Sequence, residues 1–222
     1  MKIKGAIFDM DGTLLDSLGG WDVLWEWCGE RFLGVSGYKP DVEVDKAVRT
    51  MVLIDAMDYI HDHYGFGENG RELFDYLNGI LPELYTEKFD FKPGAREFLD
   101  YCYTNGIKMC LASATETKYI DIALDRHGMR KYFTRVLSCA EIGRGKEFPD
   151  IYLAALEALG TDASETWVFE DSYVALETAA GIGLPTVGIF DRNNFEQERL
   201  KGSATHYIAE GETLMKLVPF EC

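Results

Sequence analysis

The sequence has no long apolar run, no closely spaced cysteine pair and comparatively few basic residues. No stretch approaches the roughly 18 apolar residues that a transmembrane helix needs, so we expect no membrane span. The five cysteines form no Cys-x-x-Cys pair and are odd in number, which is typical of reduced structural thiols. The 22 Lys and Arg against 38 Asp and Glu give a net charge of −16, which disfavours nucleic acids and anionic membranes as partners.

The composition is that of a folded globular protein. Of the 222 residues, 47% are hydrophobic and 27% are charged, which is enough apolar material for a buried core. The length fits one large domain, or one domain with a sizeable insertion. The first five residues lead into a short apolar stretch and then into acidic residues, unlike a signal peptide, so we expect a cytoplasmic protein.

Apolar runs and turn residues divide the chain into two patterns. A short apolar run at residues 5–8 predicts a buried strand, whereas residues 18–91 look helical, are rich in aromatics and contain no convincing strand. Strands and helices alternate from residue 95 onward. The predicted strands are 107–112, 135–138, 166–169, 186–190 and 206–209, and the predicted helices are 95–105, 118–127, 150–159, 173–180 and a last one near the C-terminus. This alternation predicts an α/β fold with a mostly parallel sheet, into which residues 18–91 are inserted after the first strand.

Polar side chains follow three of the predicted strands at their carboxyl ends, where open α/β sheets bind ligands. They are Asp9 and Asp11, then Ser113 and Thr115, then Glu170 and Asp171. If these strands are neighbours, four carboxylates converge on one edge of the sheet, and like charges so close together raise each other's pKa. A hard divalent cation relieves this repulsion, and Mg²⁺ is the natural choice for oxygen ligands.

This arrangement of acids suits phosphoryl transfer. Asp9 and Asp11 are two residues apart, so in an extended chain both side chains point to one side. One carboxylate would attack phosphorus and form an aspartyl-phosphate, while the other would protonate the leaving oxygen and later deprotonate water. Lys146 is the candidate for a positive charge on the phosphate, and Ser113 is a candidate hydrogen-bond donor.

Four segments of the chain resemble the motifs of the haloacid dehalogenase superfamily, in the same order and with the same spacing. The segments are Phe-Asp-Met-Asp-Gly-Thr-Leu-Leu-Asp-Ser at 8–17, Leu-Ala-Ser-Ala-Thr at 111–115, Lys146 with Pro-Asp-Ile-Tyr at 149–152, and Glu-Asp-Ser at 170–172. The last has the acidic-pair form of the subfamily that contains beta-phosphoglucomutase and many small-molecule phosphatases. The true dehalogenases lack the second aspartate of the first motif, so Asp11 favours phosphate chemistry.

The resemblance implies a Rossmann-like three-layer core of residues 1–16 and 91–222, with a small all-α cap domain of residues 17–90. It implies that Asp9 is the nucleophile and Asp11 the general acid and base. By the same resemblance, Mg²⁺ is held by the Asp9 carboxylate, the Asp11 carbonyl, Glu170 and Asp171. The phosphoryl group is held by Ser113, the Ala114 backbone and Lys146.

We therefore interpret the chain as a Mg²⁺-dependent phosphatase of a small phosphorylated metabolite. Trp21 and Arg49 in the predicted cap are candidate substrate contacts, with a packed core position and a surface salt bridge as the respective alternatives. Asp16 and Ser17 are typical of a helix cap or hinge. A beta-phosphoglucomutase-like phosphomutase is one alternative, which the histidine missing at Trp21 disfavours; a non-catalytic binding protein is another. The sequence leaves the oligomeric state open, a monomer included.

Overall fold

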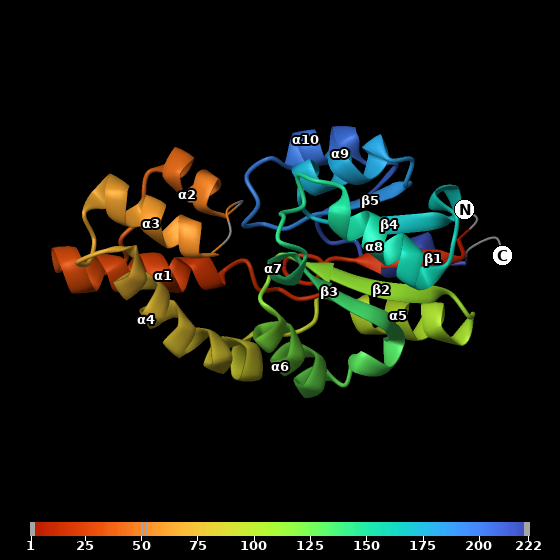
Figure 1. The fold of residues 1–222 in the computed structure, drawn as a ribbon, viewed down its shortest axis with the longest axis horizontal. Coiled ribbons are helices and arrows are strands. Elements are labelled where there is room, and N and C mark those ends of the chain that lie inside the picture. Colours follow the sequence, from red (N-terminus) through yellow and green to blue (C-terminus); the bar gives the residue numbers. More distant parts are fainter. Residues whose placement is uncertain (1–2, 50, 52, 220–222) are drawn as a thin grey trace. The chain divides into compact units, whose positions relative to one another are not determined.

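The computed structural model describes residues 3–49, 51 and 53–219, and the chain divides into two compact units (Figure 1). One unit combines Met1–Leu18 with Phe89–Cys222, and the other is Gly19–Lys88. The sequence placed these divisions at 16/17 and 90/91. In the structure the first unit extends two residues further at each division, to Leu18 and from Phe89. Hydrogen bonds join the two chain segments there: the Asp16 amide donates to the Asp90 carbonyl at 2.9 Å, and the Lys92 amide donates to the Leu14 carbonyl at 2.8 Å.

The first unit is built on a six-stranded sheet in the order β3-β2-β1-β4-β5-β6. The strands are β1 (Gly5–Phe8), β2 (Lys108–Ser113), β3 (Phe133–Ser138), β4 (Thr166–Glu170), β5 (Thr186–Ile189) and β6 (His206–Ile208). Every pairing is parallel, and Gly5 of β1 is in register with Lys108 of β2 and with Thr166 of β4. The carboxyl ends of β1, β2 and β4 therefore lie side by side, which confirms the predicted α/β fold with its parallel sheet.

Helices cover both faces of this sheet. They are α5 (Ala95–Thr104), α6 (Thr117–His127), α7 (Cys139–Ile142), α8 (Asp150–Leu159), α9 (Tyr173–Gly181) and α10 (Gln197–Ser203). Side chains of successive residues in β1 point to opposite faces of the sheet, as the pleat of a strand requires. Ile7 packs in one cluster with buried residues of α8, α9 and α10, whereas the Phe8 ring contacts Phe98 of α5 with ring centroids 6.0 Å apart. The sheet is thus the middle of three layers.

Two elements near the C-terminus differ from the sequence prediction. Helix α10 was not predicted, because its seven residues are too few to display a helical period and Leu200 is the residue that it buries. The last predicted helix is a 3₁₀ helix of four residues, Leu214–Leu217. Further 3₁₀ helices span Arg130–Tyr132 and Ala163–Glu165.

The second unit, as far as the described residues show, consists of helices and loops. Its helices are α1 (Gly20–Cys28), α2 (Val42–Val48), α3 (Leu53–Tyr64) and α4 (Gly70–Glu83), with π-helical turns at Gly29–Leu33 and Leu84–Lys88. A core of its own includes Trp25 and Met57. The expectation that Asp16 or Ser17 caps a helix is wrong, because α1 starts after Gly19 and has no side-chain cap. Within the described residues, no helix combines the length and apolar composition that crossing a membrane requires.

Candidate active site

The first predicted motif forms a tight loop directly after β1. Asp9 ends the strand's pairing with β4, because its amide donates to the Phe169 carbonyl at 3.0 Å. Gly12 has a φ of +83°, and a Cβ at this position would lie 2.7 Å from the carboxylate of Asp171. A side chain at Gly12 would therefore be strained by its backbone and would collide with Asp171. Glycine is required here because the loop of β1 approaches the end of β4 so closely.

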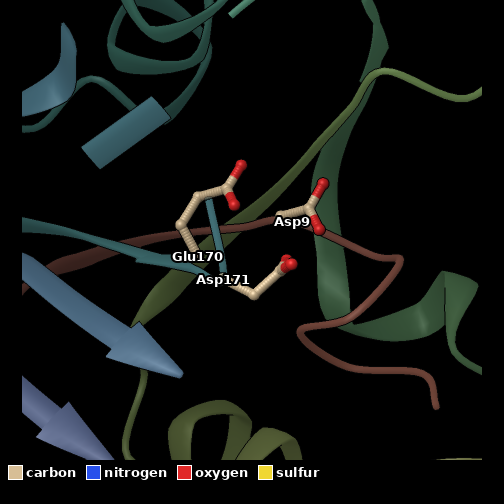
Figure 2. Close-up of side chains that lie close together, drawn as sticks. All are labelled: Asp9, Glu170 and Asp171. Atoms are coloured by element: carbon tan, nitrogen blue, oxygen red, sulfur yellow. The ribbon is translucent and has the colours of Figure 1, made fainter. Parts of the chain in front are cut away.

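Three of the four carboxylates that the sequence predicted at this edge converge, and the carboxylate of Asp11 is not among them. Asp9 at the end of β1 and Glu170 and Asp171 at the end of β4 place one ligand oxygen each within 4.8 Å of one another (Figure 2). Their exposed fractions are 6%, 2% and 6%, so water screens their mutual repulsion poorly. Buried carboxylate oxygens in a close group are the donor set of a hard divalent cation, so these residues fit a metal ion.

Lys146 adds one positive charge to this group. It lies in the loop between α7 and α8, and its ammonium contacts the carboxylate of Asp9 and that of Glu170, the latter at 2.5 Å. Burial by itself lowers the pKa of Lys146, but the charges of Asp9 and Glu170 outweigh it and hold that pKa well above its usual value. Lys146 therefore stays positively charged at any physiological pH.

The acids at the end of β4 bind protons more tightly than usual. Burial raises the pKa of Glu170 to about 7, with Lys146 acting against this rise and Asp9 adding to it. Burial also raises the pKa of Asp171 well above its usual value, and the charges of Glu170 and Asp9 reinforce the shift. A cation placed among these oxygens would remove the repulsion and displace the protons.

Asp171 is held by two neutral donors that the motif search did not identify as functional. The hydroxyl of Thr13 donates to Asp171 Oδ1 at 3.1 Å. The side-chain amide of Asn194 donates to the Asp171 backbone carbonyl and, at 3.3 Å, to Asp171 Oδ2. Thr13 lies inside the first motif, so its position beside Asp9 and Asp11 could have indicated a role, but nothing in the sequence links Asn194 to a residue 23 positions earlier.

Asp11 lies on the same loop, and its carboxylate accepts hydrogen bonds from two hydroxyls. Ser17 Oγ donates to Asp11 Oδ1 at 2.7 Å, and Thr115 Oγ1 donates to Asp11 Oδ2 at 2.6 Å. The Ser17 hydroxyl thus supports an acid of the first motif instead of capping a helix. Thr115 connects the loops that follow β1 and β2, so the second motif reaches the first through Asp11.

Ser113 and Ala114 follow β2 at the same edge of the sheet. Ser113 is 1% exposed, and its hydroxyl oxygen accepts the Thr115 amide at 3.1 Å, which leaves the hydroxyl proton for another acceptor. Ala114 is exposed in the loop that leads to α6. The arrangement places a hydroxyl donor and a loop backbone beside the acids of β1.

A buried phenol lies close enough to feel the charges of this group. Tyr152 of α8 is 1% exposed, and among the described residues no hydrogen-bond partner was found for its hydroxyl. Burial raises the pKa of Tyr152 well above its usual value, the charge of Lys146 lowers it, and Glu170 and Asp9 raise it. The tyrosine of the third motif therefore belongs to the electrostatic surroundings of Lys146.

Trp21 and Arg49 lie in the helical unit, and their described contacts are with residues of that unit. The Arg49 guanidinium forms a two-pronged ion pair with Asp45, with both N–O distances at 3.0 Å. It also lies 6.0 Å from the centre of the Trp21 ring. The side chains of Arg49 and Asp45 are 12% and 11% exposed, so Arg49 forms the salt bridge named as its alternative role, in a position largely shielded from water. The role of both residues as substrate contacts stays a prediction.

The chain is similar to proteins that are named as phosphatases. The chain is 26% identical over 218 residues to the phosphorylated carbohydrates phosphatase of Thermotoga maritima, covering 96% of this chain and 97% of that protein. It is 28% identical over 171 residues to hexitol phosphatase B of Escherichia coli strain K12, covering 77% of this chain and 76% of that protein.

Its fold is similar to that of beta-phosphoglucomutase from Clostridium difficile, with a TM-score of 0.70, 19% identity, and coverage of 93% of this chain and 91% of that one. The family model of haloacid dehalogenase-like hydrolases matches residues 3–183, which is most of the chain. The resemblance that rested on four motifs is therefore confirmed, and the chain belongs to the haloacid dehalogenase-like hydrolases.

Proposed function

We propose that this protein is a Mg²⁺-dependent phosphatase that hydrolyses a small phosphorylated metabolite through an aspartyl-phosphate on Asp9. The observation that carries the proposal is the buried group of Asp9, Glu170 and Asp171 at the carboxyl edge of the sheet. Lys146 contacts two of these acids. Two relatives named as phosphatases, of phosphorylated carbohydrates and of hexitols, support a small phosphate ester as the substrate.

Each acid has a distinct task in this proposal. The Asp9 carboxylate attacks phosphorus, and the bond between phosphorus and the leaving oxygen breaks. Asp11 gives a proton to that oxygen and then takes one from the water that attacks the aspartyl-phosphate and releases Asp9. Mg²⁺, held by Asp9, the Asp11 carbonyl, Glu170 and Asp171, would neutralise charge on the phosphoryl oxygens.

The remaining residues of the site hold the phosphoryl group. Lys146 supplies a positive charge beside Asp9, where negative charge develops during the transfer. Ser113 donates its hydroxyl proton to a phosphoryl oxygen, and the Ala114 amide adds a second donor. For the helical unit we propose the role of a cap that selects the leaving group, with Trp21 and Arg49 as its candidate contacts.

The test is release of inorganic phosphate from a panel of sugar phosphates, polyol phosphates and nucleotides, measured with Mg²⁺ and with EDTA. We expect one preferred class of substrate, dependence on Mg²⁺, and loss of activity in Asp9→Asn. The matched control is Asp16→Asn, which changes an exposed acid that pairs with Arg192. Phosphate release that survives Asp9→Asn would overturn the mechanism, and isomerisation of a sugar phosphate without phosphate release would replace the phosphatase by a phosphomutase.

A further inference from the structure

We propose that Asn194 is a positioning residue that fixes the carboxylate of Asp171 in the orientation a divalent cation needs. The inference rests on the metal site of the proposed function and adds to it a residue outside the four motifs. Asn194 lies in the loop between β5 and α10. It contacts a predicted metal ligand with its side chain, so its effect on the site passes through Asp171.

The hydrogen bonds around Asp171 leave each carboxylate oxygen with one neutral donor. Thr13 donates to Oδ1 at 3.1 Å, and the Asn194 amide donates to Oδ2 at 3.3 Å and to the backbone carbonyl of Asp171. One side-chain amide thus holds both the main chain and the carboxylate of the same residue. Two neutral donors on opposite oxygens restrict rotation of the carboxylate without adding a charge that would compete with a cation.

The orientation of the Asn194 amide follows from its neighbours. Its Oδ1 accepts the Glu196 backbone amide at 3.2 Å, and a backbone amide only donates. The Asp171 carbonyl, on the other side, only accepts. The NH₂ group must therefore face Asp171, and the reversed orientation would leave two oxygens in contact.

The loop that carries Asn194 is fastened to the core of the first unit. The backbone amide of Asn194 donates to the Asp191 carbonyl at 3.0 Å, and Gln197 Nε2 donates to the same carbonyl at 2.6 Å. The Asp191 carboxylate is 2% exposed and forms an ion pair with Lys92 at 2.6 Å. Because these contacts fix the backbone on both sides of Asn194, its side-chain amide contacts Asp171 in one defined position.

The position of Asp171 makes such support necessary. Asp9 and Glu170 lie close to its carboxylate and repel it. Gly12 leaves space for this carboxylate because glycine has no Cβ, and a Cβ there would lie 2.7 Å from it. Without the Asn194 amide, the repelled carboxylate would be free to turn away from the other two ligands. Residues that orient metal ligands typically change metal affinity by about 10- to 100-fold when they are removed.

The test measures binding of Mn²⁺ alone, by the loss of the electron paramagnetic resonance signal of free Mn²⁺. We expect Asn194→Ala to weaken Mn²⁺ binding by about 10- to 100-fold. Asn194→Leu keeps the shape of the side chain and removes its hydrogen bonds, so the same loss is expected there without a cavity. The matched control is Asn193→Ala, one residue away, which should bind Mn²⁺ like the wild type because only the backbone amide of Asn193 enters the network.

Two further readouts separate positioning from general damage. Melting temperatures of the metal-free variants should stay close to that of the wild type, and the KM for substrate should change little at saturating Mg²⁺ while the Mg²⁺ requirement rises. Mn²⁺ binding by Asn194→Leu that equals the wild type would overturn the inference while leaving the proposed function intact. Absence of Mn²⁺ binding by the wild type would overturn both.

Discussion

Both units bury a basic side chain against carboxylates, but the charges balance in one and not in the other. In the helical unit, Arg49 pairs with both oxygens of Asp45, and Trp25 Nε1 donates to Asp45 Oδ1 at 2.7 Å. In the α/β unit, Lys146 contacts Asp9 and Glu170, while the third acid of the cluster, Asp171, receives neutral donors. With all three acids ionised, the cluster has three negative charges against the one ammonium that contacts it.

The difference in charge balance distinguishes a structural ion pair from a group suited to bind a cation. A balanced, fully hydrogen-bonded pair such as Asp45 and Arg49 fixes the geometry of a core, because losing either partner leaves a buried charge. In the unbalanced group, burial and the neighbouring negative charges raise the pKa of Glu170 and of Asp171, and a bound cation would relieve the repulsion. Charge imbalance under burial is thus the feature that supports the α/β unit as the site of the proposed chemistry.

The largest effect is expected from Lys146→Met, which removes the cation of the unbalanced group. Phosphate release should fall by about 10²- to 10³-fold, because charge developing beside Asp9 loses its stabilising partner. The measurement is kcat on the preferred substrate of the panel at saturating Mg²⁺. The control Lys4→Met removes an exposed ammonium that pairs with the partly buried Glu165, and it should leave kcat unchanged. A kcat within about threefold of the wild type in Lys146→Met would contradict this account.

Arg49→Met tests the balanced pair and should act mainly on stability. We expect a loss of about 3 kcal/mol in the free energy of unfolding by urea, because Asp45 stays buried without its partner. Arg71→Met is the matched control: it also breaks an Arg–Asp pair four residues apart in the helical unit, but an exposed one, worth less than about 0.5 kcal/mol. Unchanged stability with a raised KM would instead favour the predicted substrate contact.

The pH dependence of the metal-free protein should follow the raised pKa of Glu170. Its folded pKa of about 7 exceeds the usual value of 4.5, so its contribution to stability is full below pH 4.5 and is lost as the pH rises through 7. Melting temperatures should therefore fall across this window, and stabilisation by Mg²⁺ should grow. The difference between wild type and Glu170→Gln isolates the effect, and equal slopes for the two proteins would refute it.

The smallest effect is expected at Asp11, whose oxygens accept two neutral hydroxyls. Thr115→Val keeps the shape of the side chain and removes one donor, which should lower kcat by about five- to tenfold. Steady-state kinetics at saturating Mg²⁺ measures the change. Thr117→Val removes a hydroxyl that contacts the exposed Glu141 and serves as the control. Equal kinetics in both variants would show that the Thr115 contact does not orient the acid.

Much of the fold was predictable because it depends on local patterns. The apolar run of β1, the alternation beyond residue 95 and the aromatic helical insertion each leave a signal within a few residues. Helix α10 left none, since seven residues show no period, and Ser17 gave a misleading signal because a serine before a helix is typical of a cap. A salt bridge was the alternative role for Arg49, but only the structure shows that its partner is Asp45, four residues earlier, and that the pair is largely shielded from water.

The candidate site divides in the same way. The sequence by itself determined the candidate groups, because Asp9, Asp11, Glu170 and Asp171 follow predicted strands, and the order of the motifs identified the family. Only the tertiary structure decided that β1 lies between β2 and β4, which brings Asp9, Glu170 and Asp171 within 4.8 Å of one another and places the Lys146 ammonium beside two of them. It also decided that Asn194 supports Asp171, because contacts between residues far apart in the chain depend on packing and leave no trace in local spacing.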